Sequence, residues 1–357
     1  MIDSFEIKSF RGFRDFKFEP LERVNLITGS NNVGKTALLE AMYLNLTPVK
    51  AFRSNLESNT EESSTEHNIF RGFKDIKYPL DNVTKWGWLF HGKNLSDGVE
   101  LVSTRKDVKT RLTMDWWIGH ADGDGIPVFG DIPLDDAQNL YLHVQVEGID
   151  GTRIWRIDRS GSRLPQPYVF DSVPVRLLFN VCSRSSQDDT KWFSQLADVG
   201  RQDEVVQVLQ LIEPRLKSLA VSTSEGPAMI YGDIGIGRRV PMSQMGEGMV
   251  RLLSLVLEIT NASGGVVLID EVESGLHHSV LTRVWRAIAE AARRSDTQIF
   301  ATTHSWECIK SAHDAFLESK IYDLRLHRLE RTNDDIKAVT YDKRTLETSV
   351  EMSLEVR

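Results

Sequence analysis

The spacing of hydrophobic residues follows three different patterns along the first 48 residues. Residues 2–10 and 13–20 alternate apolar and polar side chains, with the two-residue period of a β-strand. Residues 23–29 form a short apolar run that stops at a glycine, as a buried strand does. Residues 35–46 carry apolar side chains at helical spacing, and Pro48 ends the predicted helix. The opening of the chain therefore predicts three strands, a loop and a helix.

The middle of the chain predicts an inserted region that is rich in strands. Residues 50–70 are acidic and rich in serine, and we expect them to form an exposed loop. Alternating segments between residues 85 and 159 are separated by Asp/Gly turns, which predicts antiparallel strands. An apolar strand at 174–182 and a helical segment follow. The apolar stripe of that helical segment is Val205, Leu209, Ile212 and Leu216.

The last third alternates helices and strands. Helices are predicted at 245–260 and 280–294, and each is followed by an apolar strand. Such alternation is typical of an α/β sheet. We predict an α/β fold in three parts: a first lobe at 1–49, an inserted β-rich and helical region at 50–240, and a second part of the lobe at 241–357.

The composition excludes several classes of protein. Hydrophobic residues make up 41% of the 357 residues and charged residues 26%, which is ordinary for a globular chain. A net charge of −8 argues against a uniformly basic nucleic-acid coat, although a local basic groove is compatible with it. The two cysteines do not suggest a secreted disulfide framework. No apolar run reaches the about 18–20 residues of a membrane helix. We expect a cytoplasmic protein with no membrane partner.

A phosphate-binding motif joins the third predicted strand to the first predicted helix. The segment GSNNVGKT fits the pattern G-x-x-x-x-G-K-[ST] at every fixed position. Glycines let the backbone N–H groups curl around phosphates, and the N-terminus of the helix adds favourable partial charge. Lys35 is expected to reach the β- and γ-phosphates, and the Thr36 hydroxyl to ligate Mg²⁺. The predicted nucleotide-binding residues are Gly29, Ser30, Asn31, Asn32, Val33, Gly34, Lys35 and Thr36.

Two later strands end in polar residues that suit the same chemistry. The run VVLI is followed by Asp270 and Glu271, at the end of a strand where α/β sheets bind ligands. We expect Asp270 to bind Mg²⁺, directly or through water, and Glu271 to orient or deprotonate the attacking water. His304 follows the next apolar strand, and we interpret it as a contact to the γ-phosphate.

These segments carry a resemblance to a known family. The opening IKSFRGFRDFKFEPLERVNLITGSNNVGKTALLEAMYL, followed by MGEGMVRLL, IDEVESGLHH and ATTHS, resembles an ABC-type ATPase of the RecF/OLD-like branch, related to SMC and DNA-repair ATPases. The resemblance implies an ABC-ATPase head with a central mixed sheet, which uses ATP and Mg²⁺. It also implies that two heads sandwich two ATP molecules, each held by the phosphate loop of one head and the signature loop of the other.

The signature loop departs from the family pattern. The family has L-S-G-G-Q, and here residues 245–249 read MGEGM, so Gly246 stands in the place of the serine. The resemblance assigns Gly246, Glu247 and Gly248 to the nucleotide of the partner head. Backbone N–H groups at the start of the following helix can replace the serine as donors.

The resemblance also shapes the expected partners. OLD-type proteins carry a Toprim nuclease after the ATPase, but only 53 residues follow His304 here, and the predicted strands and helix fill them. We therefore expect an ATP-dependent sensor or scaffold that forms a head dimer, or a higher oligomer, and acts with a separate nuclease or toxin. Resemblance to stand-alone OLD-like ATPases suggests prokaryotic defence against phage.

Three other interpretations stay open. A RecF-like repair ATPase would bind DNA directly and with strong salt dependence. The nucleotide-binding subunit of a transporter is disfavoured, because its signature lies much nearer to the phosphate loop. A scaffold that hydrolyses ATP very slowly is disfavoured by the intact Asp270–Glu271 pair.

Overall fold

The computed structural model describes residues 1–48, 89–91, 97–118, 126–127, 140–148, 151–157, 173–178, 186–223, 227–332 and 335–352. The loop predicted at 50–70 lies outside these residues. The strands are β1 Ser4–Phe10, β2 Phe13–Phe18, β3 Val24–Gly29, β4 Val99–Arg105, β5 Val108–Ile118, β6 Ile126–Pro127, β7 Leu140–Gly148, β8 Gly151–Ile157, β9 Val175–Leu178, β10 Ser218–Ser222, β11 Met229–Asp233, β12 Arg239–Pro241, β13 Val266–Ile269, β14 Gln298–Thr302, β15 Leu324–Thr332 and β16 Asp335–Tyr341. The helices are α1 Lys35–Leu46, α4 Ser186–Asp198, α5 Gln202–Leu209, α6 Glu247–Asn261, α7 Leu281–Arg294, α8 Trp306–Leu317 and α9 Lys343–Glu351.

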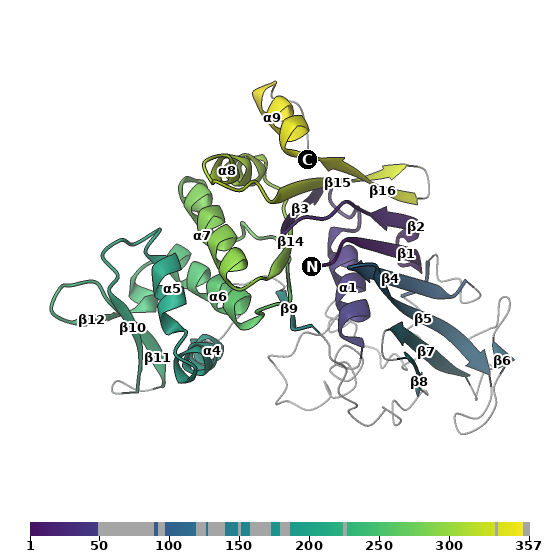
Figure 1. The fold of residues 1–357 in the computed structure, drawn as a ribbon, viewed down its shortest axis with the longest axis horizontal. Coiled ribbons are helices and arrows are strands. Elements are labelled where there is room, and N and C mark those ends of the chain that lie inside the picture. The colour runs from purple at the N-terminus through teal and green to yellow at the C-terminus, as the bar shows by residue number, and fades with distance from the viewer. Residues whose placement is uncertain are drawn as a thin grey trace, which may run out of the picture.

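A central sheet of six strands positions the site (Figure 1). Its order is β16-β15-β3-β14-β13-β9, and every neighbouring pair is parallel except β15 and β16. All residues of β3 and of β13 are buried, as expected for parallel strands that are covered on both faces. The carboxyl ends of β3, β13 and β14 therefore meet at one edge of the sheet.

A second, antiparallel sheet covers one face of the central sheet, with helix α1 between them (Figure 1). Its order is β2-β1-β4-β5-β7-β8, and β6 pairs with β5. The strands of the predicted insertion thus continue the hairpin formed by β1 and β2, while β9 of the same region joins the central sheet. The boundaries at residues 49 and 240 stay a prediction, and strand pairing crosses both of them.

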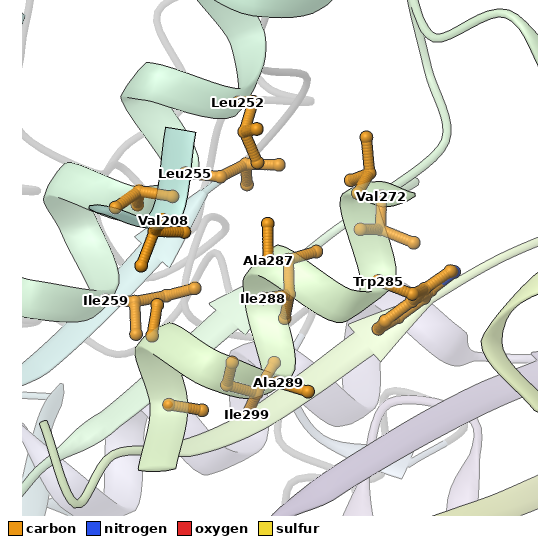
Figure 2. Close-up of a cluster of buried hydrophobic side chains, with 14 of the residues drawn as sticks. Val208, Leu252, Leu255, Ile259, Val272, Trp285, Ala287, Ile288, Ala289 and Ile299 are labelled. Carbon is orange, nitrogen blue, oxygen red and sulfur yellow. The ribbon is translucent and has the colours of Figure 1, made fainter. Parts of the chain in front are cut away.

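Helices cover the other face of the central sheet. Figure 2 shows the core there, where α6 and α7 meet: Leu252, Leu255 and Ile259 lie near Ile288 and Val208. Buried residues line almost the whole of α6, because the sheet, α4, α5 and α7 surround it. The small sheet β10-β11-β12 packs beside α4 and α5. Among the described residues, no helix is both long enough and apolar enough to span a bilayer.

One predicted helix is shorter than the sequence pattern suggested. Helix α5 ends at Leu209, and Ile212 and Leu216 lie in the turns that follow it. Pro214 explains the difference, because proline lacks the N–H that a helix interior needs and disfavours helical geometry at the preceding residue. The apolar side chains still reach the core, since Leu216 is fully buried.

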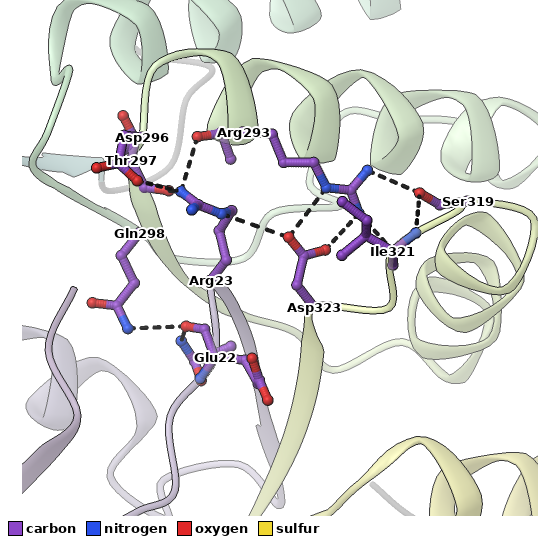
Figure 3. A network of polar contacts seen from close by, with 11 residues as sticks. Glu22, Arg23, Arg293, Asp296, Thr297, Gln298, Ser319, Ile321 and Asp323 are labelled. Carbon is purple, nitrogen blue, oxygen red and sulfur yellow. Dashed lines mark hydrogen bonds and ion pairs between the residues drawn. The ribbon is translucent and has the colours of Figure 1, made fainter.

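A polar network ties together the amino ends of the central strands (Figure 3). Arg23, just before β3, donates to Asp296 Oδ1 at 3.0 Å and lies 3.6 Å from Asp323, which precedes β15. Arg293 of α7 donates to Asp323 Oδ2 at 3.1 Å and to Ser319 Oγ at 2.9 Å. The network fixes the spacing of β3, β14 and β15 at the edge opposite the phosphate loop.

Candidate active site

The phosphate loop is held in a conformation that only its glycines allow. Gly29 has φ +138°, and a Cβ there would lie 2.5 Å from the carbonyl oxygen of Leu329 in β15. Gly34, with φ +112°, precedes α1, and a Cβ there would lie 3.1 Å from both Phe13 and Ile336. A side chain at either position would have a strained backbone, and at Gly29 it would also clash with the backbone of β15. The motif glycines are therefore required by the packing of β2, β15 and β16 on the loop.

Lys35 lies across this loop. Its ammonium donates to the carbonyl oxygens of Gly29 and Ser30, at 2.7 and 2.9 Å, and the residue is 5% exposed. Burial lowers the pKa of Lys35, while the neighbouring carboxylates of Asp270 and Glu271 act in the opposite direction. The Lys35 ammonium thus points into the loop. Phosphate oxygens of a bound nucleotide would take the place of the Gly29 and Ser30 carbonyl oxygens as its hydrogen-bond acceptors.

The other loop residues divide into an exposed group and a buried anchor. Ser30, Asn31, Asn32 and Thr36 are exposed, and Val33 is 2% exposed in the core. Asn32 has φ +61°, in the left-handed region that asparagine tolerates better than most residues. The polar side of the loop is consequently open to a ligand.

The two predicted Mg²⁺ ligands lie next to each other. Thr36 Oγ1 donates to Asp270 Oδ2 at 2.9 Å, and Thr302 Oγ1 donates to Asp270 Oδ1 at 2.5 Å. No group of three or more His, Cys, Asp or Glu gathers for a metal among the described residues. One hydroxyl and one carboxylate fit Mg²⁺, which keeps waters and is completed by substrate phosphates. The residues present therefore fit this ion.

The predicted catalytic pair lies at the same edge. The Glu271 carboxylate approaches His304 Nε2 to 3.7 Å, and both side chains are partly exposed. Glu271 has φ +51°, which is uncommon for a residue with a long side chain and indicates local strain held by its surroundings. Two hydrogen bonds hold its backbone: the Glu271 N–H donates to Thr302 Oγ1 at 2.8 Å, and the Glu271 carbonyl accepts from Arg251 at 3.1 Å.

The signature residues lie elsewhere. Gly246, with φ +98° and ψ 148°, precedes α6, and both it and Glu247 are exposed, with Gly248 half-buried. Helix α6 packs on the face of the central sheet opposite to α1. Within the described chain, no hydrogen bond or ion pair joins residues 246–248 to the loop 29–36. The fold brings together Gly29–Thr36, Asp270, Glu271 and His304, and leaves the signature apart.

Sequence reasoning missed several residues of the site. Arg251, 4% exposed, donates from α6 to the carbonyl oxygens of Glu271 and Val272. Thr302 joins Asp270 and Glu271, and Glu273 accepts from the His304 N–H at 2.9 Å. Each lies inside a segment that the motifs cover, but only the folded chain shows its partner.

A buried ion pair behind the loop was also missed. Arg11, in the turn between β1 and β2, pairs with Glu40 of α1, one helical turn beyond Thr36. Burial raises the pKa of Glu40 to about 7, and Arg11 opposes that change. The pair ties the antiparallel sheet to the helix that carries Lys35 and Thr36.

Two family descriptions match the chain. The family "AAA domain, putative AbiEii toxin, Type IV TA system" matches residues 136–308, and the family "AAA ATPase domain" matches residues 1–73. An "ATP/GTP phosphatase" of Helicobacter pylori is 22% identical over 383 aligned residues, 97% of each chain. "DNA replication and repair protein RecF" of Desulforamulus reducens is 36% identical over 91 residues, 24% of each chain.

A solved structure matches over the whole length. "Crystal structure of the SmcHead bound to the C-winged helix domain of ScpA" superposes with a TM-score of 0.50 at 13% identity, covering 98% of this chain and 99% of that one. The chain is thus similar to AAA/ABC-type ATPases, RecF among them, and it has the fold of an SMC head. The predicted α/β head with its central mixed sheet is confirmed, as is the predicted resemblance to the RecF and SMC ATPases. The functions assigned to individual residues of this ATPase stay predictions.

Proposed function

We propose that this ABC-type ATPase hydrolyses ATP to ADP and phosphate with Mg²⁺, and that two heads dimerise around two ATP molecules. The observation that carries the proposal is the placement of its two nucleotide motifs. The phosphate loop and Gly246 both have exposed polar faces, yet they belong to helices on opposite faces of the sheet. A second copy related by two-fold symmetry supplies what each site lacks.

The residues of one head divide the chemistry between them. Lys35 and the loop N–H groups bind the β- and γ-phosphates. Thr36 and Asp270 would hold Mg²⁺, which would neutralise charge on the transferred phosphoryl group. Glu271 holds the attacking water in line with the γ-phosphate, and His304 contacts that phosphate from the neighbouring strand. The 3.7 Å separation of Glu271 and His304 places the two groups side by side at this edge of the sheet.

The dimer is tested with a variant that binds ATP without hydrolysing it. Glu271→Gln removes the carboxylate but keeps the shape of the side chain, so the ATP-bound state should accumulate. Light scattering after size exclusion should give twice the chain mass of 40.5 kDa with ATP and Mg²⁺, and the single mass with ADP. A single mass under both conditions, with ATP bound, would refute the sandwich.

We further propose that this ATPase is the sensor or scaffold subunit of a prokaryotic anti-phage system with a separate effector. This proposal rests on the resemblance to stand-alone OLD-like ATPases; the family matched at residues 136–308 is described as a putative toxin of a type IV toxin–antitoxin system. The test is capture of the tagged chain from its host with the neighbouring genes intact. A stoichiometric nuclease or toxin supports the proposal, and a chain that elutes alone contradicts it.

An alternative function is a RecF-like ATPase that binds DNA directly. The 36% identity over 91 residues to a RecF protein favours it. This alternative predicts DNA-stimulated ATP hydrolysis and an affinity for DNA that falls steeply with salt, because phosphate contacts release counterions. ATP hydrolysis that is indifferent to DNA would remove the alternative.

A further inference from the structure

The Glu273 side chain joins the carboxyl ends of β13 and β14, and the proposed hydrolysis assigns it no part. Glu273 lies four residues after β13, and its Oε1 accepts a hydrogen bond from the backbone N–H of His304, 2.9 Å away. His304 lies two residues after the end of β14 at Thr302, and its ring is 3.7 Å from the Glu271 carboxylate. A carboxylate on one strand end thus fixes the backbone of the histidine on the next.

The position of Glu273 is itself set from three sides. Val272, next to it, is 1% exposed and packs in the core near Trp285, as Figure 2 shows. The Val272 N–H donates to the Thr302 carbonyl at 3.0 Å, and Arg251 donates to the Val272 carbonyl at 3.2 Å. The segment that carries Glu273 therefore has little freedom to shift.

The turn after Glu273 closes the arrangement. The Leu276 N–H donates to the Glu273 carbonyl at 2.9 Å, and Gly275 takes φ +74° within the turn. The Leu276 side chain lies toward the first turn of α6, where a Cβ on Gly248 would be 3.9 Å from it. The backbone of Glu273 is thus held between the end of β14 and the signature helix.

The two carboxylate oxygens of Glu273 differ in their hydrogen bonding. Oε2 is buried and makes no hydrogen bond in the described structure, whereas Oε1 binds His304. The carboxylate also lies near enough to Lys35 to raise its pKa, against the larger effect of burial. The hydrogen bond of this carboxylate is therefore made by Oε1, and its donor is the His304 N–H.

We propose that Glu273 is a positioning residue: its hydrogen bond to the His304 N–H holds the imidazole beside Glu271 in the geometry that hydrolysis needs. This inference rests on the proposed ATPase function. Without the Glu273 acceptor, the first residues after β14 would no longer be tied to β13 at this point, and His304 would sample other positions.

Four variants test the proposal by steady-state ATP hydrolysis. Glu273→Ala removes the acceptor, and Glu273→Asp withdraws it by one methylene. Both should lower kcat about 10- to 100-fold, the scale of a misplaced catalytic group, with KM for ATP changed less than about 2-fold. Glu273→Gln keeps an amide oxygen at the same reach and should retain most of kcat. Glu307→Ala, which removes a carboxylate three residues after His304, is the matched control and should leave both constants unchanged.

The outcomes separate the inference from the function on which it rests. A wild-type chain that does not hydrolyse ATP contradicts the proposed function. Wild-type hydrolysis that Glu271→Gln abolishes, together with an unchanged kcat in Glu273→Ala, overturns only the role of Glu273. A Gln variant as slow as the Ala variant also overturns it, because the acceptor would not be what matters. If Glu273→Ala does not fold, judged by thermal melting, the Asp and Gln variants carry the same comparison.

Discussion

The two edges of the central sheet use the same strands for opposite purposes. At the amino edge, Arg23, Arg293 and Asp323 satisfy one another and the neighbouring backbone, and each side chain is at most 20% exposed. At the carboxyl edge, Glu271 and His304 keep 49% and 36% of their side-chain surface exposed, and Glu271 has strained backbone angles. Polar groups that complete one another stabilise a fold, while groups left open and held under strain are available for chemistry.

The comparison predicts that the two edges separate activity from stability. Lys35→Ala should lower ATP hydrolysis at least about 100-fold, because the phosphates lose their principal cation. The melting temperature should change little, since alanine suits a helix and the Lys35 ammonium bonds only the loop itself. Nucleotide titration and thermal melting of the same sample check both parts. A variant that melts much earlier would make Lys35 a structural residue.

At the amino edge the opposite result is expected. Asp323→Ala leaves Arg23 and Arg293 without their shared carboxylate, in a partly buried setting. Such a change should lower the free energy of unfolding by about 2–3 kcal/mol, less than for a fully buried pair, because water reaches the site. Urea denaturation measures the loss, and kcat should stay within about 2-fold of wild type once the protein is folded. A large fall in kcat would mean that the two edges are coupled.

Stability at low pH depends on a histidine inside the sheet. Burial of His327, whose ring lies 3.3 Å from Asn25 Oδ1 and 3.1 Å from Thr340 Oγ1, lowers its pKa to about 3. The folded chain therefore favours the neutral ring, so this stabilisation is complete above the unfolded pKa near 6.5 and is lost as pH falls toward 3. Between pH 7.5 and 5 the wild type should lose about 2 kcal/mol more than His327→Gln.

Denaturation curves at the two pH values measure this difference. The matched control is His278→Gln, which changes an exposed histidine and should keep the wild-type pH dependence. Equal losses in wild type and in His327→Gln would contradict the assignment of the effect to His327.

The smallest effect concerns the signature glycine. A Cβ on Gly246 meets nothing within 4 Å, yet its φ of +98° disfavours any side chain. Gly246→Ser should therefore destabilise the fold by about 1–2 kcal/mol without raising the hydrolysis rate. Gly248→Ala, in the first turn of α6, lacks the positive φ and should be neutral or slightly stabilising. Thermal melting of both variants measures these changes in stability. Faster hydrolysis in Gly246→Ser would show that the missing serine limits the enzyme.

The sequence predicted the active edge far better than the structural edge. Gly29, Lys35, Asp270 and His304 stand in short motifs at strand ends, so local pattern and the rule that parallel strands share a carboxyl edge placed them together. Arg23 and Asp323 are 300 residues apart and have no local signal. Pairing between distant residues is set by the packed fold and not by a short pattern.

Other contacts between distant parts of the chain were also not predicted from the sequence. The alternation in residues 2–20 predicted β1 and β2, but alternation does not reveal which strand lies alongside, so the pairing of β1 with β4 was not foreseen. Arg251 stands among apolar residues of a buried helix, and its contact with the carbonyl oxygens after β13 is visible in the folded chain but not in the sequence pattern. The early end of α5 could have been predicted, because Pro214 is visible in the sequence.

The central claim is that each nucleotide site is built from the phosphate loop of one head and the signature of another. It is tested most directly by mixing two inactive variants, Lys35→Ala and Gly248→Asp; the second places a carboxylate against the γ-phosphate, while the fold offers its Cβ no contact closer than 3.9 Å. Mixing should restore about a quarter of the wild-type rate, since half of the dimers pair the two variants and one of their two sites is then intact. A mixture no more active than either variant alone would contradict the shared site.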